Sequence, residues 1–196
     1  MEWSLHPLIC QNLWSLWGTP QIDAFATRFN HKIKNYFSPV PDSQALAIDA
    51  FLQPWHNLFL YIFPPTKTLR KVLRKIRESL NVQVILIAPF WPQQAWFPDL
   101  LDLLTEEPRS LPPWGDLLTT TLDQKECLRV NTLRLHAWRL SSISSEREIF
   151  QKKLPQFSPL AIENQQINCI THIGKNSVIG VLRGRYILSH PLFPSS

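Results

Sequence analysis

Residues 57–90, NLFLYIFPPTKTLRKVLRKIRESLNVQVILIAPF, contain the pattern from which the fold class is predicted. It contains two short apolar runs, 57–63 and 82–90, and their continuous hydrophobicity is typical of strands covered on both faces. Between these runs, apolar side chains recur at helical spacing at Leu69, Val72, Leu73, Ile76 and Leu80. Strand, helix and strand in this order form a βαβ unit, so the sequence predicts a parallel sheet.

The segments on either side continue this pattern as far as residue 107. Residues 5–17 carry apolar side chains at helical spacing, and Gly18 follows them as a stop signal. Residues 21–27 are a third apolar run that suits a buried strand, and a further helix is predicted over 93–104, with Pro98 at its start or kinking it. We therefore expect residues 1–107 to form one α/β domain with a parallel sheet and flanking helices.

The composition changes after residue 107. Residues 108–120 include PRSLPPWGD and are predicted to be a proline-rich linker. Residues 121–196 are predicted to be a C-terminal tail that is partly helical and otherwise irregular or poorly ordered. Within this tail we expect a helix over 127–145, followed near the end by one or two short strands that have nothing to pair against.

The composition limits the class of protein. With 44% hydrophobic residues, eight Trp and eleven Phe among 196 residues, disorder throughout the chain is excluded. The formal net charge of +5 favours an acidic partner such as DNA or RNA, although an ordinary basic protein would show the same excess.

Cysteine spacing and hydropathy point to an intracellular protein. Cys10, Cys127 and Cys169 are odd in number and far apart, so neither a disulfide framework nor a metal site is expected, and a reducing compartment fits best. No apolar run reaches the roughly 18 residues that a membrane helix needs. We expect a cytoplasmic or nuclear location and no membrane contact.

Chemistry is expected where parallel strands end, because ligands of open α/β sheets bind beyond their carboxyl ends. Asp23 follows one predicted strand and could accept from a ribose hydroxyl or an ammonium group; alternatively it caps a turn or pairs with Arg28. Residues 63–66, Phe-Pro-Pro-Thr, follow the second strand, and their plainer interpretation is a helix start with Thr66 as the N-cap.

Four motifs in order carry a resemblance to a known family: IDAFATRFNHKIKNYFS (22–38), DAFLQPW (49–55), LYIFPPTKTLRKVLRKIRE (60–78) and VILIAPFWPQQAWFPDLL (84–101). Together they resemble the region that follows ribonuclease H in the polyproteins of DIRS-like retrotransposons. That region is similar to phage-type DNA N6-adenine methyltransferases, which have a Rossmann-like fold and use S-adenosylmethionine. The resemblance covers roughly residues 2–118.

Sequences at the edges of this region resemble neighbouring parts of the same polyproteins. EWSLHP (2–7) resembles the junction just after ribonuclease H, and LRVNTLRLHAWRLSS (128–142) resembles the linker before the tyrosine recombinase. This implies a domain that once packed against a reverse transcriptase and ribonuclease H region.

The resemblance assigns roles to individual residues. It implies that the cofactor lies against six of them: Asp23, Ala24, Ala26, Asn30, Asp49 and Trp55. Residues Phe63, Pro64, Pro65 and Thr66 stand where amino-methyltransferases carry Asn or Asp, then Pro-Pro, then Tyr or Phe. Phe63 supplies no acceptor for the adenine amino group, and Thr66 has no ring to stack on the base. The implied protein is at most a degenerate DNA N6-adenine methyltransferase, inactive rather than active, that keeps S-adenosylmethionine or DNA binding.

Two alternative functions stay open. One is a nucleic-acid-binding accessory module of a retrotransposon, whose contacts would come from two basic groups: Arg28, Lys32 and Lys34 in the first loop, and Lys67, Arg70, Lys71, Arg74, Lys75 and Arg77 along the predicted helix. A solvated helix face would show the same cations. The other is a genomic remnant without a selected function.

Overall fold

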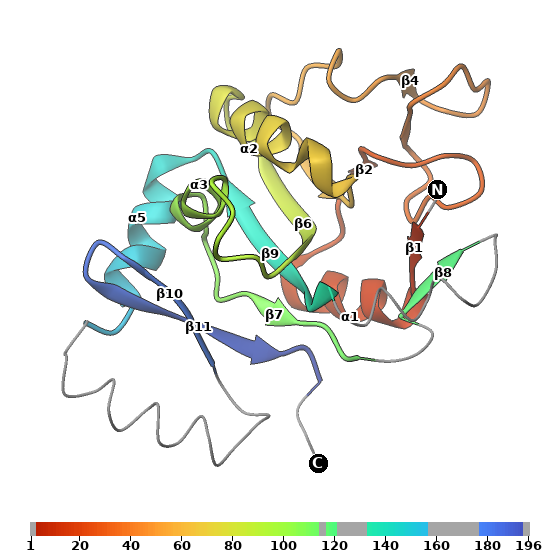
Figure 1. The fold of residues 1–196 in the computed structure, drawn as a ribbon. Helices are drawn as coiled ribbons and strands as arrows, with labels where there is room; N and C mark the ends of the chain where they lie inside the picture. The colour runs from red at the N-terminus through yellow and green to blue at the C-terminus, as the bar shows by residue number, and fades with distance from the viewer. Residues whose placement is uncertain (1–2, 114–116, 121–132, 157–176, 194–196) are drawn as a thin grey trace.

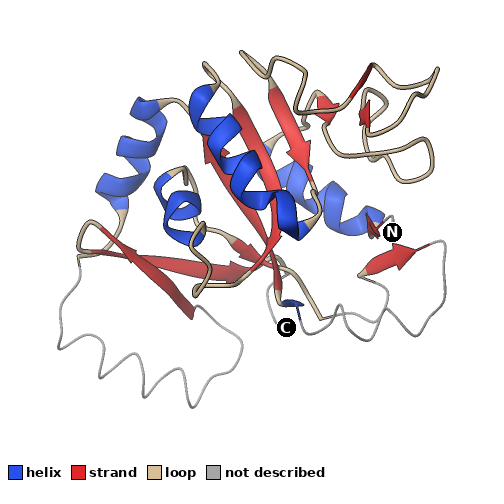
Figure 2. Ribbon diagram, turned by 45° about the horizontal axis from the view of Figure 1, so that its top comes forward, coloured by secondary structure: helices blue, strands red, loops and turns tan. Residues whose placement is uncertain are grey.

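A seven-stranded mixed sheet runs through the chain, and helices cover both of its faces (Figure 1, Figure 2). The computed structural model describes residues 3–113, 117–120, 133–156 and 177–193. The elements are β1 (Trp3–Leu5), α1 (Pro7–Trp17), β2 (Ile22–Asp23), β3 (Phe37–Ser38), β4 (Ala47–Ile48), β5 (Phe59–Ile62), η1 (Thr66–Thr68), α2 (Leu69–Glu78), β6 (Gln83–Pro89), α3 (Phe97–Asp102), β7 (Arg109–Ser110), β8 (Leu118–Thr120), β9 (Leu135–Ser141), α5 (Ser144–Lys153), β10 (Ser177–Leu182) and β11 (Arg185–Pro191).

The predicted βαβ unit is confirmed. The strand order in the large sheet is β10-β11-β7-β9-β6-β5-β2, and β2, β5 and β6 are parallel to one another. Helix α2 connects β5 to β6 and covers one face of the sheet (Figure 1). Two small sheets lie apart from the large one: β1 pairs with β8, and β3 pairs with β4.

The strands alternate between two hydrophobic clusters on opposite faces of the sheet. Along β6, Val84 and Leu86 join the cluster under α2, α3 and α5, whereas Ile85 and Ile87 join the cluster under α1. This is the two-residue period of a strand with both faces buried, and it explains why the apolar run of 82–90 is continuous.

Helix α2 ends earlier than its apolar pattern predicts. Leu69, Val72, Leu73 and Ile76 are buried as expected, but Leu80 is 69% exposed. The helix stops at Glu78 and Ser79 adopts an extended conformation, so Leu80 no longer lies on the helical stripe. The expectation that Leu80 faces the core is therefore wrong.

Two other helices follow their stop and start signals. Helix α1 ends at Trp17, where Gly18 adopts a positive φ of 87° and donates its N–H to the carbonyl of Trp14. Helix α3 is shorter than the predicted 93–104, and Pro98 lies in its first turn. The third predicted strand also shrinks, because only Ile22 and Asp23 pair with β5.

The C-terminal part of the chain differs most from expectation. Within the predicted helix over 127–145, Leu135–Ser141 is instead the strand β9, which lies antiparallel to β6 from Gln83↔Ser141 to Pro89↔Leu135; residues 127–132 lie outside the described ranges. Its neighbour in sequence, Ser144–Lys153, is helix α5. The segment that resembles a linker thus provides a central strand.

The strands near the end of the chain do have partners. β10 pairs antiparallel with β11, and β11 pairs with β7, so the expectation of strands with nothing to pair against is wrong. The division into residues 1–107, 108–120 and 121–196 stays a prediction, but the large sheet draws strands from all three of these ranges.

Asp102, the last residue of α3, ties this C-terminal part to the βαβ unit. Its carboxylate pairs with Arg147 of α5 at 3.3 Å and with Arg183, in the β10–β11 turn, at 3.4 Å. Arg77 of α2 lies 3.6 Å from the same carboxylate. Within the described ranges, no helix is both long and apolar enough to span a bilayer.

Candidate functional site

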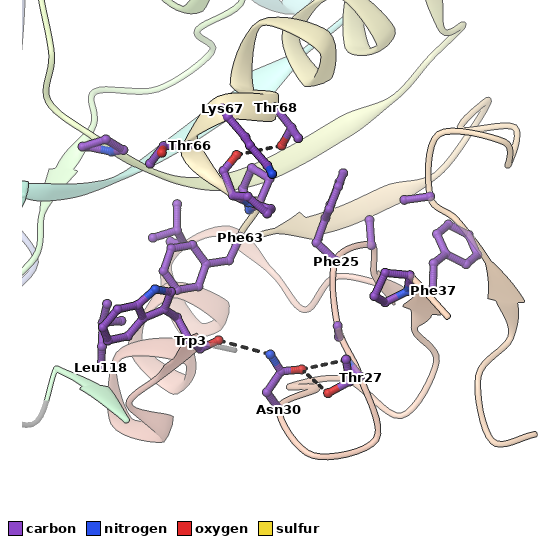
Figure 3. A pocket seen from close by; sticks show the side chains of 18 of the residues that line it. Trp3, Phe25, Thr27, Asn30, Phe37, Phe63, Thr66, Lys67, Thr68 and Leu118 are labelled. Carbon is purple, nitrogen blue, oxygen red and sulfur yellow. Dashed lines mark hydrogen bonds between the residues drawn. The ribbon is translucent and has the colours of Figure 1, made fainter. Parts of the chain in front are cut away.

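A cavity of about 840 Å³ lies where the parallel strands β2, β5 and β6 end (Figure 3). Residues 24–27 leave β2 along its wall, residues 63–68 leave β5, and Pro89 and Trp91 lie at the end of β6. This is the edge where open α/β sheets bind ligands. The volume falls within the roughly 300–1,000 Å³ typical of small-molecule sites.

The cavity brings together most of the residues that the resemblance singles out. Ala24, Ala26, Asn30, Asp49 and residues 63–66 all line it, although they come from three separate segments of the chain. The β5–α2 connection carries the proline pair into this wall.

Asp23 and Trp55 do not line the cavity; both lie behind its wall. The side chain of Trp55 is fully buried, and its Nε1 donates to the carbonyl of Ala50 at 2.9 Å. This bond fixes the segment that carries Ala50 and Phe51 into the wall. Trp55 thus supports the cavity from outside.

Asp23 is 2% exposed and holds backbone groups of the loop that follows β2. Its carboxyl accepts from the N–H of Lys32 at 2.9 Å and from the N–H of Phe25. Desolvation by burial raises the pKa of Asp23 to about 7, and the two N–H groups offset only part of this effect. Of the two alternatives to a ligand role, turn capping fits, whereas pairing with Arg28 is wrong because Arg28 pairs with Asp42 at 3.0 Å.

Asn30 joins this loop to the N-terminal strand β1. Its Oδ1 accepts from the backbone N–H of Thr27 at 2.7 Å and from the Thr27 hydroxyl at 3.1 Å. Its Nδ2 donates to the carbonyl of Trp3 at 3.2 Å (Figure 3). The amide oxygen and the amide nitrogen of Asn30 thus connect two segments of the cavity lining, the loop after β2 and strand β1.

Asp49 lines the cavity from a tight turn. It has a positive φ of 52°, and its Oδ1 accepts from the N–H of Phe51 at 2.9 Å. The Phe51 ring lies edge-on to Phe25 at 5.3 Å, and the Nζ of Lys71 sits over it at 3.9 Å. A cation–π contact of this kind holds the aromatic wall in place.

Residues 63–66 are fixed by the turn into η1. The carbonyl of Pro65 accepts from the backbone N–H of Thr68 at 2.9 Å and from its hydroxyl at 2.7 Å. Thr66 is exposed and is the first residue of η1, with Pro65 before it, so the expectation of Thr66 as an N-cap is wrong. Phe63 is half-buried and lines the cavity with a ring that can accept no hydrogen bond in its plane.

The predicted nucleic-acid contacts do not form one uniform group. Lys67 lines the mouth of the cavity, and Arg70, Lys71 and Arg74 are exposed on α2. Others are engaged with the protein: the Nζ of Lys75 donates to the carbonyl of Phe51 at 2.9 Å, and burial lowers its pKa. Arg77 pairs with Asp99 at 3.1 Å. Of the loop cations, Lys34 is exposed and Lys32 is half-buried.

Sequence reasoning missed part of the cavity wall. Phe25 and Phe51 lie next to assigned residues, so their adjacency was a usable signal. Trp3, Leu118 and Leu135 also line the cavity, but they reach it through the β1–β8 and β6–β9 pairings. Such long-range pairings leave no local pattern in the sequence.

Comparison with known proteins found no match for this chain among protein-family models, curated proteins or solved structures.

Proposed function

We propose that this chain is a retroelement-derived, methyltransferase-like domain that binds S-adenosylmethionine in the cavity and has lost efficient methyl transfer. One observation carries the proposal: the cavity at the ends of β2, β5 and β6 gathers Ala24, Ala26, Asn30, Asp49 and residues 63–66 from distant segments. These are residues to which the resemblance assigns the cofactor and the reacting base. In this proposal the three parallel strands and their helices are the core of a Rossmann-like fold.

The residues around the cavity fit the cofactor chemically. The buried alanines Ala24 and Ala26 leave room for close approach of a ligand to the backbone after β2. The Asp49 carboxylate is an acceptor for ribose hydroxyls or an ammonium group, and Phe25 and Phe51 provide apolar contact for an adenine ring. S-adenosylmethionine would supply an activated methyl group on its sulfonium.

The residues at positions 63–66 account for the loss of transfer. Methylation of adenine needs the N6 lone pair to attack the methyl carbon while the carbon–sulfur bond breaks toward sulfur and N6 loses a proton. An acceptor beside N6 directs that lone pair, and Phe63 supplies none. Removing one such positioned polar group typically costs on the order of 100-fold in rate.

A second function, binding of nucleic acid without catalysis, is favoured by the cations on α2. Arg70, Lys71 and Arg74 are exposed on the helix that begins at the cavity mouth, where Lys67 also lies. Among the described residues, neither Arg70 nor Arg74 forms an ion pair. An affinity for DNA that falls steeply with salt would support this function.

Calorimetric titration of the 196-residue chain with S-adenosylmethionine tests the proposed cofactor site. The wild-type chain is expected to bind with micromolar affinity. Ala26→Leu should abolish binding because its side chain fills the cavity, whereas Ala45→Leu, outside the lining, should leave it unchanged. Absence of binding by a folded wild-type chain, or equal binding by Ala26→Leu, would contradict the proposal.

A further inference from the structure

The cavity lining divides between the two hydrophobic clusters of the sheet. One part, which we call the cofactor half, belongs to the cluster under α2 and comprises Ala24, Phe25, Phe37, Ala50, Phe51 and Trp91. The other part, the apolar half, belongs to the cluster under α1 and comprises Trp3, Phe63, Ile87, Leu118, Leu133 and Leu135. The carboxylate of Asp49 adjoins Ala50 in the cofactor half, while all six side chains of the apolar half are apolar.

The aromatic rings of the two halves differ in what they contact. In the cofactor half, the Phe51 ring makes an edge-to-face contact with Phe25 and has the ammonium of Lys71 over its face. In the apolar half, none of the ring pairs among the described residues involves Trp3 or Phe63. Figure 3 shows both side chains at the same end of the cavity, beside Leu118. Trp3 and Phe63 both line the cavity and are only partly buried, so each ring presents part of its surface to a ligand.

The backbone of Trp3 is held in place before any ligand arrives. β1 pairs with β8 with Trp3 opposite Thr120, and the Asn30 amide donates to the Trp3 carbonyl at 3.2 Å. A ring on a fixed backbone loses little conformational freedom when it stacks, which favours binding. Asn30 also links the backbone of Trp3 to the loop that follows β2, so the two halves are mechanically connected.

We propose that the apolar half binds a planar, uncharged aromatic ring of nucleobase size, stacked on the indole of Trp3. Such a ring gains by leaving water for an apolar wall and by stacking on an indole. Trp3 then supplies the stacking surface that exposed Thr66 lacks, although it lies outside the motif at positions 63–66. The choice of a nucleobase as ligand rests on the proposed function; the stacking site itself rests on the cavity.

The probe for this site is 9-methyladenine, titrated into the 196-residue chain alone and again after saturation with S-adenosylhomocysteine, which occupies the cofactor half. The wild-type chain is expected to bind the probe in both cases. Trp3→Leu keeps an apolar side chain but removes the ring, and should weaken probe binding roughly ten-fold or more. Trp3→Phe should retain most of the affinity. Trp17→Ala, which alters the same cluster outside the cavity lining, should change nothing.

The outcomes separate this inference from the proposed function. Binding of S-adenosylhomocysteine that Trp3→Leu leaves intact also shows that the variant is folded. If 9-methyladenine does not bind the wild-type chain, or binds Trp3→Leu equally well, the stacking site is refuted while the cofactor site can stand. If S-adenosylhomocysteine fails to bind but the probe binds in a Trp3-dependent manner, the proposed function fails and the stacking site stands.

Discussion

The buried carboxyl of Asp23 predicts an unusual pH dependence of stability. Burial raises its pKa from 3.8 to about 7, and Lys32, Cys10 and Tyr61 are the ionisable groups that interact with it. Because the folded state holds the proton more tightly than the unfolded chain, this carboxyl favours folding most below pH 4. That advantage is lost as the pH rises from about 4 through 7.

The size of the effect follows from the two pKa values. The interval from 3.8 to about 7 corresponds to about 4 kcal/mol in the free energy of unfolding, at roughly 1.4 kcal/mol for each pH unit. Between pH 5 and pH 8, about 3 kcal/mol of this should be lost. In Asp23→Asn the side chain keeps its shape but does not titrate, so the pH-dependent contribution of residue 23 to the free energy of unfolding disappears. The variant loses one hydrogen bond to a backbone N–H, at a cost that does not depend on pH.

Urea denaturation of wild type and Asp23→Asn at pH 5 and pH 8 measures the effect. The free energy of unfolding of the variant, relative to wild type, should rise by about 3 kcal/mol from pH 5 to pH 8. Other titrating groups are shared by both proteins, so their contributions cancel in this difference. A difference that is the same at both pH values would refute the assignment of Asp23 as a buried carboxyl that is protonated at pH 5.

Three further changes are predicted. Burial lowers the pKa of His136 to about 4, so its neutral form favours folding above pH 6.5 and this advantage fades toward pH 4; the free energy of unfolding of His136→Gln, relative to wild type, should therefore fall from pH 4 to pH 6.5, and a difference that stays constant would contradict it. Asp102→Asn should cost about 1 kcal/mol and speed proteolysis of the β10–β11 hairpin, unlike Asp99→Asn. Phe63→Asp with Thr66→Tyr should restore slow transfer of a radiolabelled methyl group to adenine-containing DNA; a folded double variant without transfer would show that the site is not recoverable.

Elements with strong local periodicity were predictable. The apolar pattern is regular in the runs of 57–63 and 82–90 and in the stripe on α2, because the same face or faces of each segment are buried along its whole length. The antiparallel strand β9 was not predictable, because LHAWRLS contains His136 and Arg139, which are polar at positions within the sheet. His136 is buried with its Nδ1 bonded to the carbonyl of Arg134 at 2.8 Å, and Arg139 lies over the Phe59 ring at 4.2 Å. The contact of Arg139 depends on a partner eighty residues earlier in the chain.

The candidate site was also predictable only where it depends on local patterns in the sequence. Residues that follow strand ends, such as Ala24, Ala26 and the prolines after Phe63, lie at the cavity because parallel strands end at one edge. Asp23 belongs to the same motif, but a side chain at the last residue of β2 is directed by the local backbone, which the sequence does not specify. Trp3 is placed at the cavity by the pairing of β1 with β8, more than a hundred residues away, and by the hydrogen bond from Asn30.

Amide hydrogen exchange of the 196-residue chain, with and without saturating S-adenosylmethionine, tests most directly whether the cavity holds the cofactor. We expect slower exchange at 24–31, 49–51 and 66–68, the segments that contribute residues to the cavity lining from the β2 loop, the turn at Asp49 and the β5–α2 connection. Exchange elsewhere, including helix α5, should stay the same. Unchanged exchange in the three segments, or protection confined to other parts of the chain, would contradict the proposed site.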